Sequence, residues 1–277
     1  MPDDVEYEAF PGVENDTNSY LLSRSGAHHV VIATAGGQYG TVIAGEMAPQ
    51  MVRTFNRIRF GLMVGVGGGI SRDSNFGVRS HLDKPPLLLL KATSQLESDH
   101  GFNQGHLANY IADVARKSQQ FKILKRYAFP GRDKDMLFEA ECRHEDKKKD
   151  CSHGNRIQCV QRLDREDDHP AVHYGEIASG NWVMTDAQMR DRLRDSHGIC
   201  CFETEAAGLM NLFPRIAIRG ICDYCDDHKN DIWQPYAAVA AAAYAKDLLR
   251  IIQPVDVENT RVVLEVLGNS TWKTSPP

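Results

Sequence analysis

The sequence predicts an α/β fold in which short buried strands alternate with helices. Several apolar runs are too short for an ordinary helix and are typical of buried strands. Stretches with helical spacing of apolar residues lie between these runs, and glycines or acidic residues follow several of them. Ligand sites of open α/β sheets lie at such strand ends.

The first half of the chain sets this alternation. Residues 1–16 are acidic and polar and predict a loop or frayed end, and no strand is expected before residue 20. The segment 71–81 is polar and irregular. The predicted elements are a strand over His29–Thr34, a helix over 41–55, a strand over 58–66 that ends in the turn Gly67-Gly68-Gly69, and helices near 87–96 and 107–118.

The second half opens with a charged insertion over 119–170 and then resumes the alternation. A single domain over 17–253 is expected, followed by a tail over 254–277. The predicted elements are a short strand over 136–140 inside the insertion, a strand over 172–177, a helix over 186–193, a strand from 199 to 203, a helix over 206–212, a strand over 216–222, a helix over 236–252 and a strand in the tail over 261–267.

The composition favours a protein that acts on small molecules. Across 277 residues, 32 basic and 37 acidic residues are mixed along the chain, which gives no electropositive surface for nucleic acid. No apolar run approaches the roughly 20 residues that a membrane span needs. The N-terminus lacks the pattern of a signal peptide, and seven cysteines do not form a disulfide framework. A cytoplasmic protein with reduced thiols is expected.

The glycine turn after the second strand admits two interpretations. Ile70 stands where the third glycine of a dinucleotide fingerprint is required, which disfavours that fingerprint. Bare backbone at Gly67 and Gly68 would let a flat or anionic ligand approach closely. A tight turn after a buried strand explains the same glycines.

The cysteines offer two weaker sites. Cys222 and Cys225 have C-x-x-C spacing, but they follow a late strand, whereas a redox motif lies between a first strand and its helix. A zinc site would draw on residues of the charged insertion, which lack paired ligand spacing; these are Cys142, His144, Cys151, His153 and Cys159. No metal site is predicted.

Three carboxylates at strand ends are the main candidates for chemistry. Glu203 and Glu205 end one apolar run and Asp223 ends another. A buried carboxylate needs hydrogen-bond donors, so a polyol ligand would suit Glu205; alternatively Glu205 caps the following helix. A partly desolvated Asp223 could serve as a general acid; alternatively it forms an Asx turn.

These residues lie in four stretches that resemble the nucleoside phosphorylase and nucleosidase superfamily, most closely the nucleosidase-like domains of fungal NACHT and ankyrin-repeat proteins. The resemblance covers about residues 17–252. The matching stretches are Gly61-Leu62-Met63-Val64-Gly65-Val66-Gly67-Gly68-Gly69, His173-Tyr174-Gly175-Glu176-Ile177-Ala178-Ser179-Gly180-Asn181, Cys201-Phe202-Glu203-Thr204-Glu205-Ala206-Ala207-Gly208-Leu209-Met210, and Arg219-Gly220-Ile221-Cys222-Asp223-Tyr224 with Trp233-Gln234-Pro235-Tyr236.

The resemblance implies a three-layer αβα sandwich with a mixed central sheet, and cleavage of an N-glycosidic bond. Glu205, with Thr204, would hold the ribose hydroxyls of a purine nucleoside or nucleotide, and Asp223 would protonate or hydrogen-bond N7 of the base. The remaining implied base-binding residues are Gly67, Gly68, Ser179, Gly180, Asn181 and Val183.

The resemblance also implies a homo-oligomer and a reaction without a cofactor. Inorganic phosphate is a possible co-substrate. Hydrolysis is favoured over phosphorolysis because no arginine next to a glycine turn clearly suits phosphate; Arg59 and Arg72 lack a motif.

Three departures from the family pattern bear on activity. First, the family's usual first strand, which ends in the acid that activates water, has no match in this sequence. Second, the segment 71–81 is too short and too polar for the strand that usually follows the glycine turn. Third, Thr204 replaces a methionine. The first two departures predict missing strands and an incomplete pocket wall. The alternative function is therefore a catalytically inactive, nucleoside-binding regulatory module.

Overall fold

The structure is a computed structural model that describes residues 13–34, 37, 40–70, 77–79, 85–102, 105–144, 159–162, 167–209 and 214–269. A five-stranded mixed sheet forms its centre, in the order β4-β5-β6-β3-β7. The strands are β3 (Gly61–Gly69), β4 (Gly77–Arg79), β5 (Tyr174–Ser179), β6 (Ile199–Glu203) and β7 (Arg215–Asp223).

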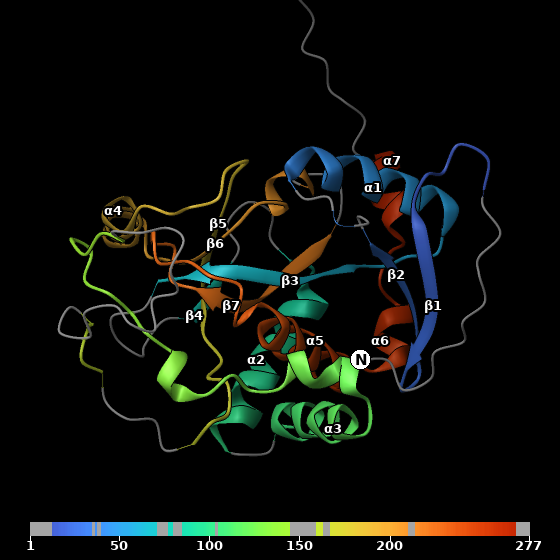
Figure 1. The fold of residues 1–277 in the computed structure, drawn as a ribbon. Helices are drawn as coiled ribbons and strands as arrows, with labels where there is room; N and C mark the ends of the chain where they lie inside the picture. The colour runs from blue at the N-terminus through green and yellow to red at the C-terminus, as the bar shows by residue number, and fades with distance from the viewer. Residues whose placement is uncertain are drawn as a thin grey trace, which may run out of the picture.

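Helices lie on both sides of this sheet. In Figure 1, α1 (Thr41–Thr54) and α4 (Ala187–His197) lie above it, and α2 (Leu87–Gly101), α3 (Leu107–Gln120) and α5 (Gln234–Ile251) lie below it. The sandwich with a mixed central sheet predicted from the family resemblance is thus confirmed. No helix among the described residues has both the length and the apolar composition needed to cross a membrane.

The main core lies between β7 and the two helices α2 and α5. Leu89 and Leu96 of α2 are fully buried against Ile216 and Ile218 of β7. Alanines on α5 let this helix approach the sheet closely, and Gly220 makes room for it, because a Cβ there would meet the Ala237 carbonyl oxygen at 1.9 Å. Burial of this apolar surface fixes the position of β7 and of the residues at its end.

Strand β2 (His28–Thr34) does not join the central sheet, which corrects the expectation of a first strand in one parallel sheet. It pairs in antiparallel fashion with β1 (Ser19–Ser25), a strand that the sequence did not predict. The two strands are joined by Gly26 and Ala27, and Gly26 has a φ of 58°. A two-residue turn of this kind matches the twist of a hairpin, so the local turn explains the pairing.

Three further predicted elements differ from the observed ones. Gly67 to Gly69 belong to β3 and do not form a turn. The polar segment 71–81 contributes the short strand β4. The helix expected over 206–212 is a 3-10 helix, η5 (Ala206–Leu209), in its described part.

The tail contains helices where a strand was predicted over 261–267. These are α6 (Pro254–Glu258) and α7 (Val263–Asn269). Val263 is fully buried against Ala48 and Val52 of α1, and Leu267 packs against the same cluster. A strand would place the exposed Glu265 on the same face as Val263 and Leu267, whereas a helix turns Glu265 away from them, so packing on α1 selects the helix.

The charged insertion over 119–170 does not lie entirely on the surface. It carries the 3-10 helices η1 (Lys122–Tyr127) and η2 (Arg132–Lys134). The strand expected over 136–140 is reduced to one bridge between Phe138 and Cys159. Leu137 and Phe138 are buried, so this part of the insertion is packed against the body of the protein.

Candidate active site

Strand ends meet at one place in the sheet because its direction reverses between β3 and β6. These strands are antiparallel and overlap only through Gly68 and Gly69, which face Phe202 and Cys201. On its other side β3 runs parallel to β7. The carboxyl ends of all three strands therefore converge, and ligand sites favour such a reversal of strand direction.

Glu203 is a buried acid that binds the backbone following β6. Its side chain is fully buried, and its carboxylate accepts hydrogen bonds from the backbone N–H of Glu205 at 3.1 Å and of Ala206 at 3.0 Å. It also pairs with Arg219. Burial by itself would raise the pKa of Glu203, but the charge of Arg219 and these hydrogen bonds hold that pKa below its ordinary value.

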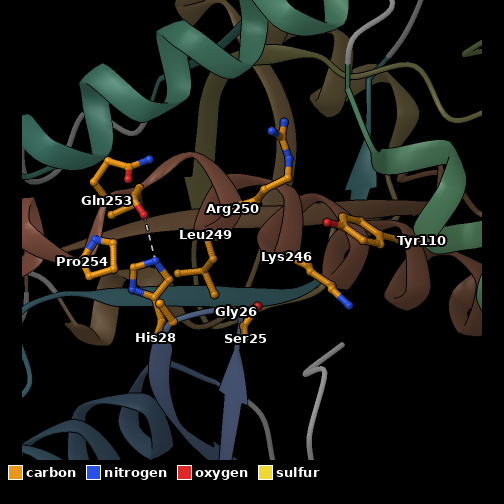
Figure 2. A pocket seen from close by; sticks show the side chains of 11 residues that line it. Ser25, Gly26, His28, Tyr110, Lys246, Leu249, Arg250, Gln253 and Pro254 are labelled. Carbon is orange, nitrogen blue, oxygen red and sulfur yellow. Dashed lines mark hydrogen bonds between the residues drawn. The ribbon is translucent and has the colours of Figure 1, made fainter.

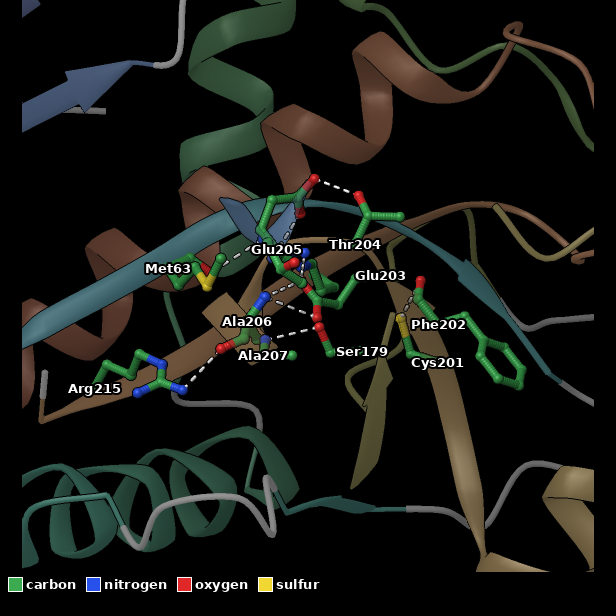
Figure 3. A network of polar contacts seen from close by, with 12 residues as sticks. Met63, Ser179, Cys201, Phe202, Glu203, Thr204, Glu205, Ala206, Ala207 and Arg215 are labelled. Atoms are coloured by element: carbon green, nitrogen blue, oxygen red, sulfur yellow. Dashed lines mark hydrogen bonds and ion pairs between the residues drawn. The ribbon is translucent and has the colours of Figure 1, made fainter. Parts of the chain in front are cut away.

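Glu205 is held less completely. Its side chain is 27% exposed; Oε2 accepts a hydrogen bond from Arg219 Nη2 at 3.1 Å, and Oε1 accepts one from the Thr204 hydroxyl. Figure 3 shows the carboxylate of Glu205 turned toward Thr204, whereas that of Glu203 lies toward Ser179 and Ala206. The acid that caps the 3-10 helix is thus Glu203, and Glu205 is the more exposed of the two acids.

Arg219 joins these two carboxylates, and sequence reasoning missed it. Its side chain is 3% exposed and lies over Gly65, where a Cβ would meet Nη1 at 2.4 Å. Its Nε has no hydrogen-bond partner in the described part of the chain. A charged residue within the apolar run of β7 was the available signal, since an arginine there needs a buried acidic partner.

Asp223 ends β7 just after an irregularity in the pairing of this strand with β3, where the register shifts between Gly67 and Gly68. Its side chain is 3% exposed. Oδ1 accepts a hydrogen bond from the backbone N–H of Cys225 at 2.9 Å, and Oδ2 accepts one from Lys229 Nζ at 2.6 Å. The first contact is the Asx turn expected as the structural alternative, so this turn and a role in chemistry occur together.

The loop after Asp223 is fixed by the charged insertion and by α4. Arg190 of α4 donates a hydrogen bond to the Tyr224 carbonyl at 2.7 Å. Tyr224 donates to Asp135 at 2.5 Å, and Trp233 donates to the Lys134 carbonyl at 3.0 Å. The insertion therefore holds one side of the site.

The residues predicted to bind the base are distributed around the two acids. Gly67 packs against Cys201 and Arg219, and a Cβ on Gly68 would meet Asp223 Oδ1 at 2.7 Å. Both glycines are required by this protein packing, whatever ligand is bound. Their role toward a base stays a prediction.

The loop after β5 lies on the Glu203 side of the site. The Gly180 N–H donates to the Glu203 carbonyl at 3.2 Å, and Ser179 Oγ accepts from the Ala207 N–H at 2.8 Å. Asn181 Oδ1 accepts from Thr41 at the start of α1. Val183 is 44% exposed. The first three residues are engaged in holding the loop, and base binding by any of the four stays a prediction.

The cysteines near Asp223 are not poised for redox chemistry. Burial raises the pKa of Cys200 to about 11 and raises that of Cys222 and Cys225 further. A thiol with a raised pKa is a poor nucleophile. Within the described ranges no three His, Cys, Asp or Glu side chains are arranged to hold a metal ion; Cys151 and His153 of the zinc hypothesis lie outside those ranges.

A separate cavity of about 300 Å³ lies near the other end of α5, beside the β1–β2 turn. It is lined by His28, Tyr110, Lys246 and Arg250, among others. Figure 2 shows the guanidinium of Arg250 and the amine of Lys246 pointing away from each other. The cavity therefore presents no convergent set of polar groups, which a specific ligand site needs.

Comparisons with known proteins bear on this site. No family model matches the chain. A nucleotide-binding leucine-rich repeat (NLR)-like protein of Hyaloscypha variabilis is 37% identical over 281 residues, which cover 90% of this chain and 27% of that protein. The ATP nucleosidase Cap17 of Escherichia coli is 35% identical over 85 residues, which cover 28% of this chain and 17% of that protein. The chain thus spans about a quarter or less of the length of these relatives.

Solved structures show the same fold. The 5′-methylthioadenosine/S-adenosylhomocysteine nucleosidase of Neisseria meningitidis superposes with a TM-score of 0.51 at 15% identity, over 90% of this chain and 91% of that chain. The nucleosidase of the same name from S. pneumoniae gives a TM-score of 0.50 at 12% identity, over 91% and 92%. The chain has the fold of these two nucleosidases, which confirms the predicted resemblance at the level of the fold.

Proposed function

We propose that this protein cleaves the N-glycosidic bond of a purine nucleoside or nucleotide. The observation that carries the proposal is the placement of two acids at converging strand ends. Glu205 is partly exposed and follows the end of β6, and Asp223 ends β7. This pair offers one carboxylate for a sugar and one for a base.

At the sugar, Glu205 accepts hydrogen bonds from the ribose hydroxyls. Glu203, Glu205 and Arg219 together hold two carboxylates and one guanidinium, so the cluster carries an excess negative charge when both acids are ionised. Positive charge develops on the sugar as the bond breaks. A fixed negative charge in a water-poor site stabilises that transition state.

At the base, Asp223 is the acid. The electron pair of the C1′–N9 bond passes into the purine ring, and a proton moves from the Asp223 carboxyl to N7. A water molecule then adds to C1′ and releases its own proton. An acid placed in this way typically accelerates a reaction by about 10²–10⁴.

Water is the proposed acceptor of the sugar, with phosphate as the competing possibility. Arg59, one candidate for a phosphate ligand, donates its guanidinium hydrogen bond to the Thr260 carbonyl. Arg72, the other candidate, lies outside the described residues. The names of the similar proteins, an ATP nucleosidase and methylthioadenosine nucleosidases, support hydrolysis of an adenine derivative. A homo-oligomer stays a prediction.

The test is release of free base by the purified protein. Adenosine, inosine, guanosine and ATP are incubated with it in the presence and absence of phosphate, and the base is followed by chromatography. Base released without phosphate supports hydrolysis, and base released only with phosphate indicates a phosphorylase. Failure to release base from any of them would contradict the proposal.

Asp223→Asn tests the mechanism. We expect turnover to fall by about 10²–10⁴, while the fold is kept because the amide oxygen can still accept the Cys225 hydrogen bond. Asp113→Asn is the matched control, since this acid is exposed and, among the described residues, its ion pair is with Arg116 on the same helix. Full activity in Asp223→Asn would refute the proposed acid.

A nucleoside-binding module without turnover is the second candidate function. The observation that favours it is the enclosure of Asp223, whose side chain is 3% exposed and already paired. Calorimetry that shows nucleoside binding by a protein that releases no base would select this function.

A further inference from the structure

Lys229 is a charged residue beside Asp223 that the proposed reaction does not use. Its Nζ lies 2.6 Å from Asp223 Oδ2, and among the described residues it is the one cation within ion-pair distance of this carboxylate. The Asp223 side chain is 3% exposed and that of Lys229 is 28% exposed. A charge pair so shielded from water interacts more strongly than one on the surface.

The loop brings Lys229 back to the strand end by a fixed route. Cys225 has a φ of 55°, which turns the chain sharply after Asp223. Asp226 then accepts hydrogen bonds from the backbone of His228 at 3.0 Å and of Lys229 at 3.3 Å. The His228 ring stacks on Phe138 of the insertion with ring centroids 3.8 Å apart. Lys229 is thus presented by a loop that is held along its length.

The other groups around the pair do not replace Lys229. Burial favours the neutral form of Lys229, but the hydrogen bond and charge of Asp223 outweigh it and raise the pKa of Lys229 above its ordinary value. Among the described residues, the remaining titratable or charged groups that act on this pocket are the Cys222 and Cys225 thiols, Asp226 and His228 on the same segment, Arg190 on α4 and Cys201 on β6.

We propose that Lys229 is a positioning residue of the reaction, which holds the Asp223 carboxylate through its ion pair and thereby governs the pH range of activity. This inference rests on the proposed function. The ammonium stabilises the carboxylate that remains when the proton has passed from Asp223 to N7 of the purine. Asp223 regains a proton from solvent before the next turnover. Lys229 keeps its own protons and acts through Asp223.

The pH profile of kcat/KM in three variants tests this role. In Lys229→Met the acid keeps its proton to higher pH, so the alkaline limb of the profile moves up by about one pH unit or more, and the maximum falls about tenfold because the carboxylate formed has lost its partner. In Lys229→Arg the positive charge is kept, so the alkaline limb stays at the pH where it lies in the parent protein. Lys246→Met, which removes a lysine from the far end of α5, leaves the profile unchanged.

Two outcomes of the profiles would overturn the proposal. An alkaline limb that stays in place in Lys229→Met means that the ammonium does not control the acid. If the acidic limb shifts and the alkaline limb does not, Asp223 works as a carboxylate. A loop that is merely loosened lowers the whole profile and leaves both limbs in place, so loosening cannot produce the expected shift of the alkaline limb.

A measurement without turnover separates this proposal from the proposed function. Carboxyl titration by NMR of the ligand-free protein, with labelled aspartate and Asp223→Asn to assign the signal, reports the proton on Asp223 directly. We expect the midpoint to rise in Lys229→Met and to stay in Lys229→Arg. An unmoved midpoint refutes the pairing, whereas a moved midpoint in a protein that releases no base refutes only the catalytic part.

Discussion

Two buried acidic clusters in this protein look alike in composition and differ in use. One is the set of Glu203, Arg219 and Glu205 at the strand ends. The other surrounds Asp247 on α5, whose fully buried carboxylate contacts His100 Nε2 at 3.2 Å and Arg250 Nε at 2.8 Å. Each cluster combines a fully buried carboxylate with a guanidinium.

The difference lies in where the second acid of each cluster stands. Asp247 also accepts a hydrogen bond from the His106 N–H at 2.8 Å, so it ties α2, α3 and α5 together, and Arg250 pairs with a second acid, Asp99 of α2, at 3.6 Å. Burial by itself would raise the pKa of Asp247, yet these partners lower it, as happens for Glu203. A lowered pKa therefore does not identify a site. The strand-end cluster differs because its second acid, Glu205, is 27% exposed where the ends of β3, β6 and β7 converge, whereas Asp99 is 17% exposed and lies on a helix.

The largest effect on stability is expected for Glu203→Gln. This variant breaks a buried ion pair and should lower the free energy of unfolding by about 3–5 kcal/mol. Because the folded-state pKa of Glu203 lies below its ordinary value of 4.5, the stabilisation is complete above about pH 4.5 and disappears as the pH falls through the lower folded-state pKa. Urea unfolding at neutral and acidic pH should show the difference from the parent protein shrinking in acid. A difference that stays constant with pH would contradict the ion pair.

Asp247→Asn is expected to have an intermediate effect on stability. The amide cannot accept from all three donors, so the free energy of unfolding should fall by about 2 kcal/mol. Turnover per folded molecule should stay unchanged, because this cluster lies away from the strand ends. Thermal unfolding and base release on the same samples check both parts. Lost turnover in a folded variant would show that the two clusters are coupled.

Glu205→Gln should change stability least and function most. Its carboxylate is partly exposed, so the free energy of unfolding is expected to change by under about 1 kcal/mol. Turnover should fall on the order of 10²-fold, since the sugar loses a fixed negative charge in the transition state. Kinetics with a ribonucleoside and its 2′-deoxy analogue check the contact, because a variant that no longer holds the hydroxyls should distinguish them less. Unchanged discrimination would place the ribose elsewhere.

Local sequence patterns determined the helices and strands of the central fold. The apolar spacing along 87–96, 107–118 and 236–252 is helical in itself, and the short run over 216–222 is apolar on both faces. Such patterns report burial, and burial is what holds these elements in place. The acids at the ends of β6 and β7 could be located in the same way, because each follows a buried strand directly.

The tertiary structure decided how these elements pair and which acid does what. A buried strand has the same pattern whether its neighbour is parallel or antiparallel, so the sequence did not reveal that β6 reverses direction beside β3. Nor did it reveal that β2, in the described part of the chain, pairs with β1 apart from the central sheet. Without the family resemblance, the residue pattern does not distinguish Glu203 from Glu205, because both follow the same apolar run. Only the fold brings Arg219 beneath both and leaves Glu205 open, because charge pairing depends on residues that are distant in the chain and close in space.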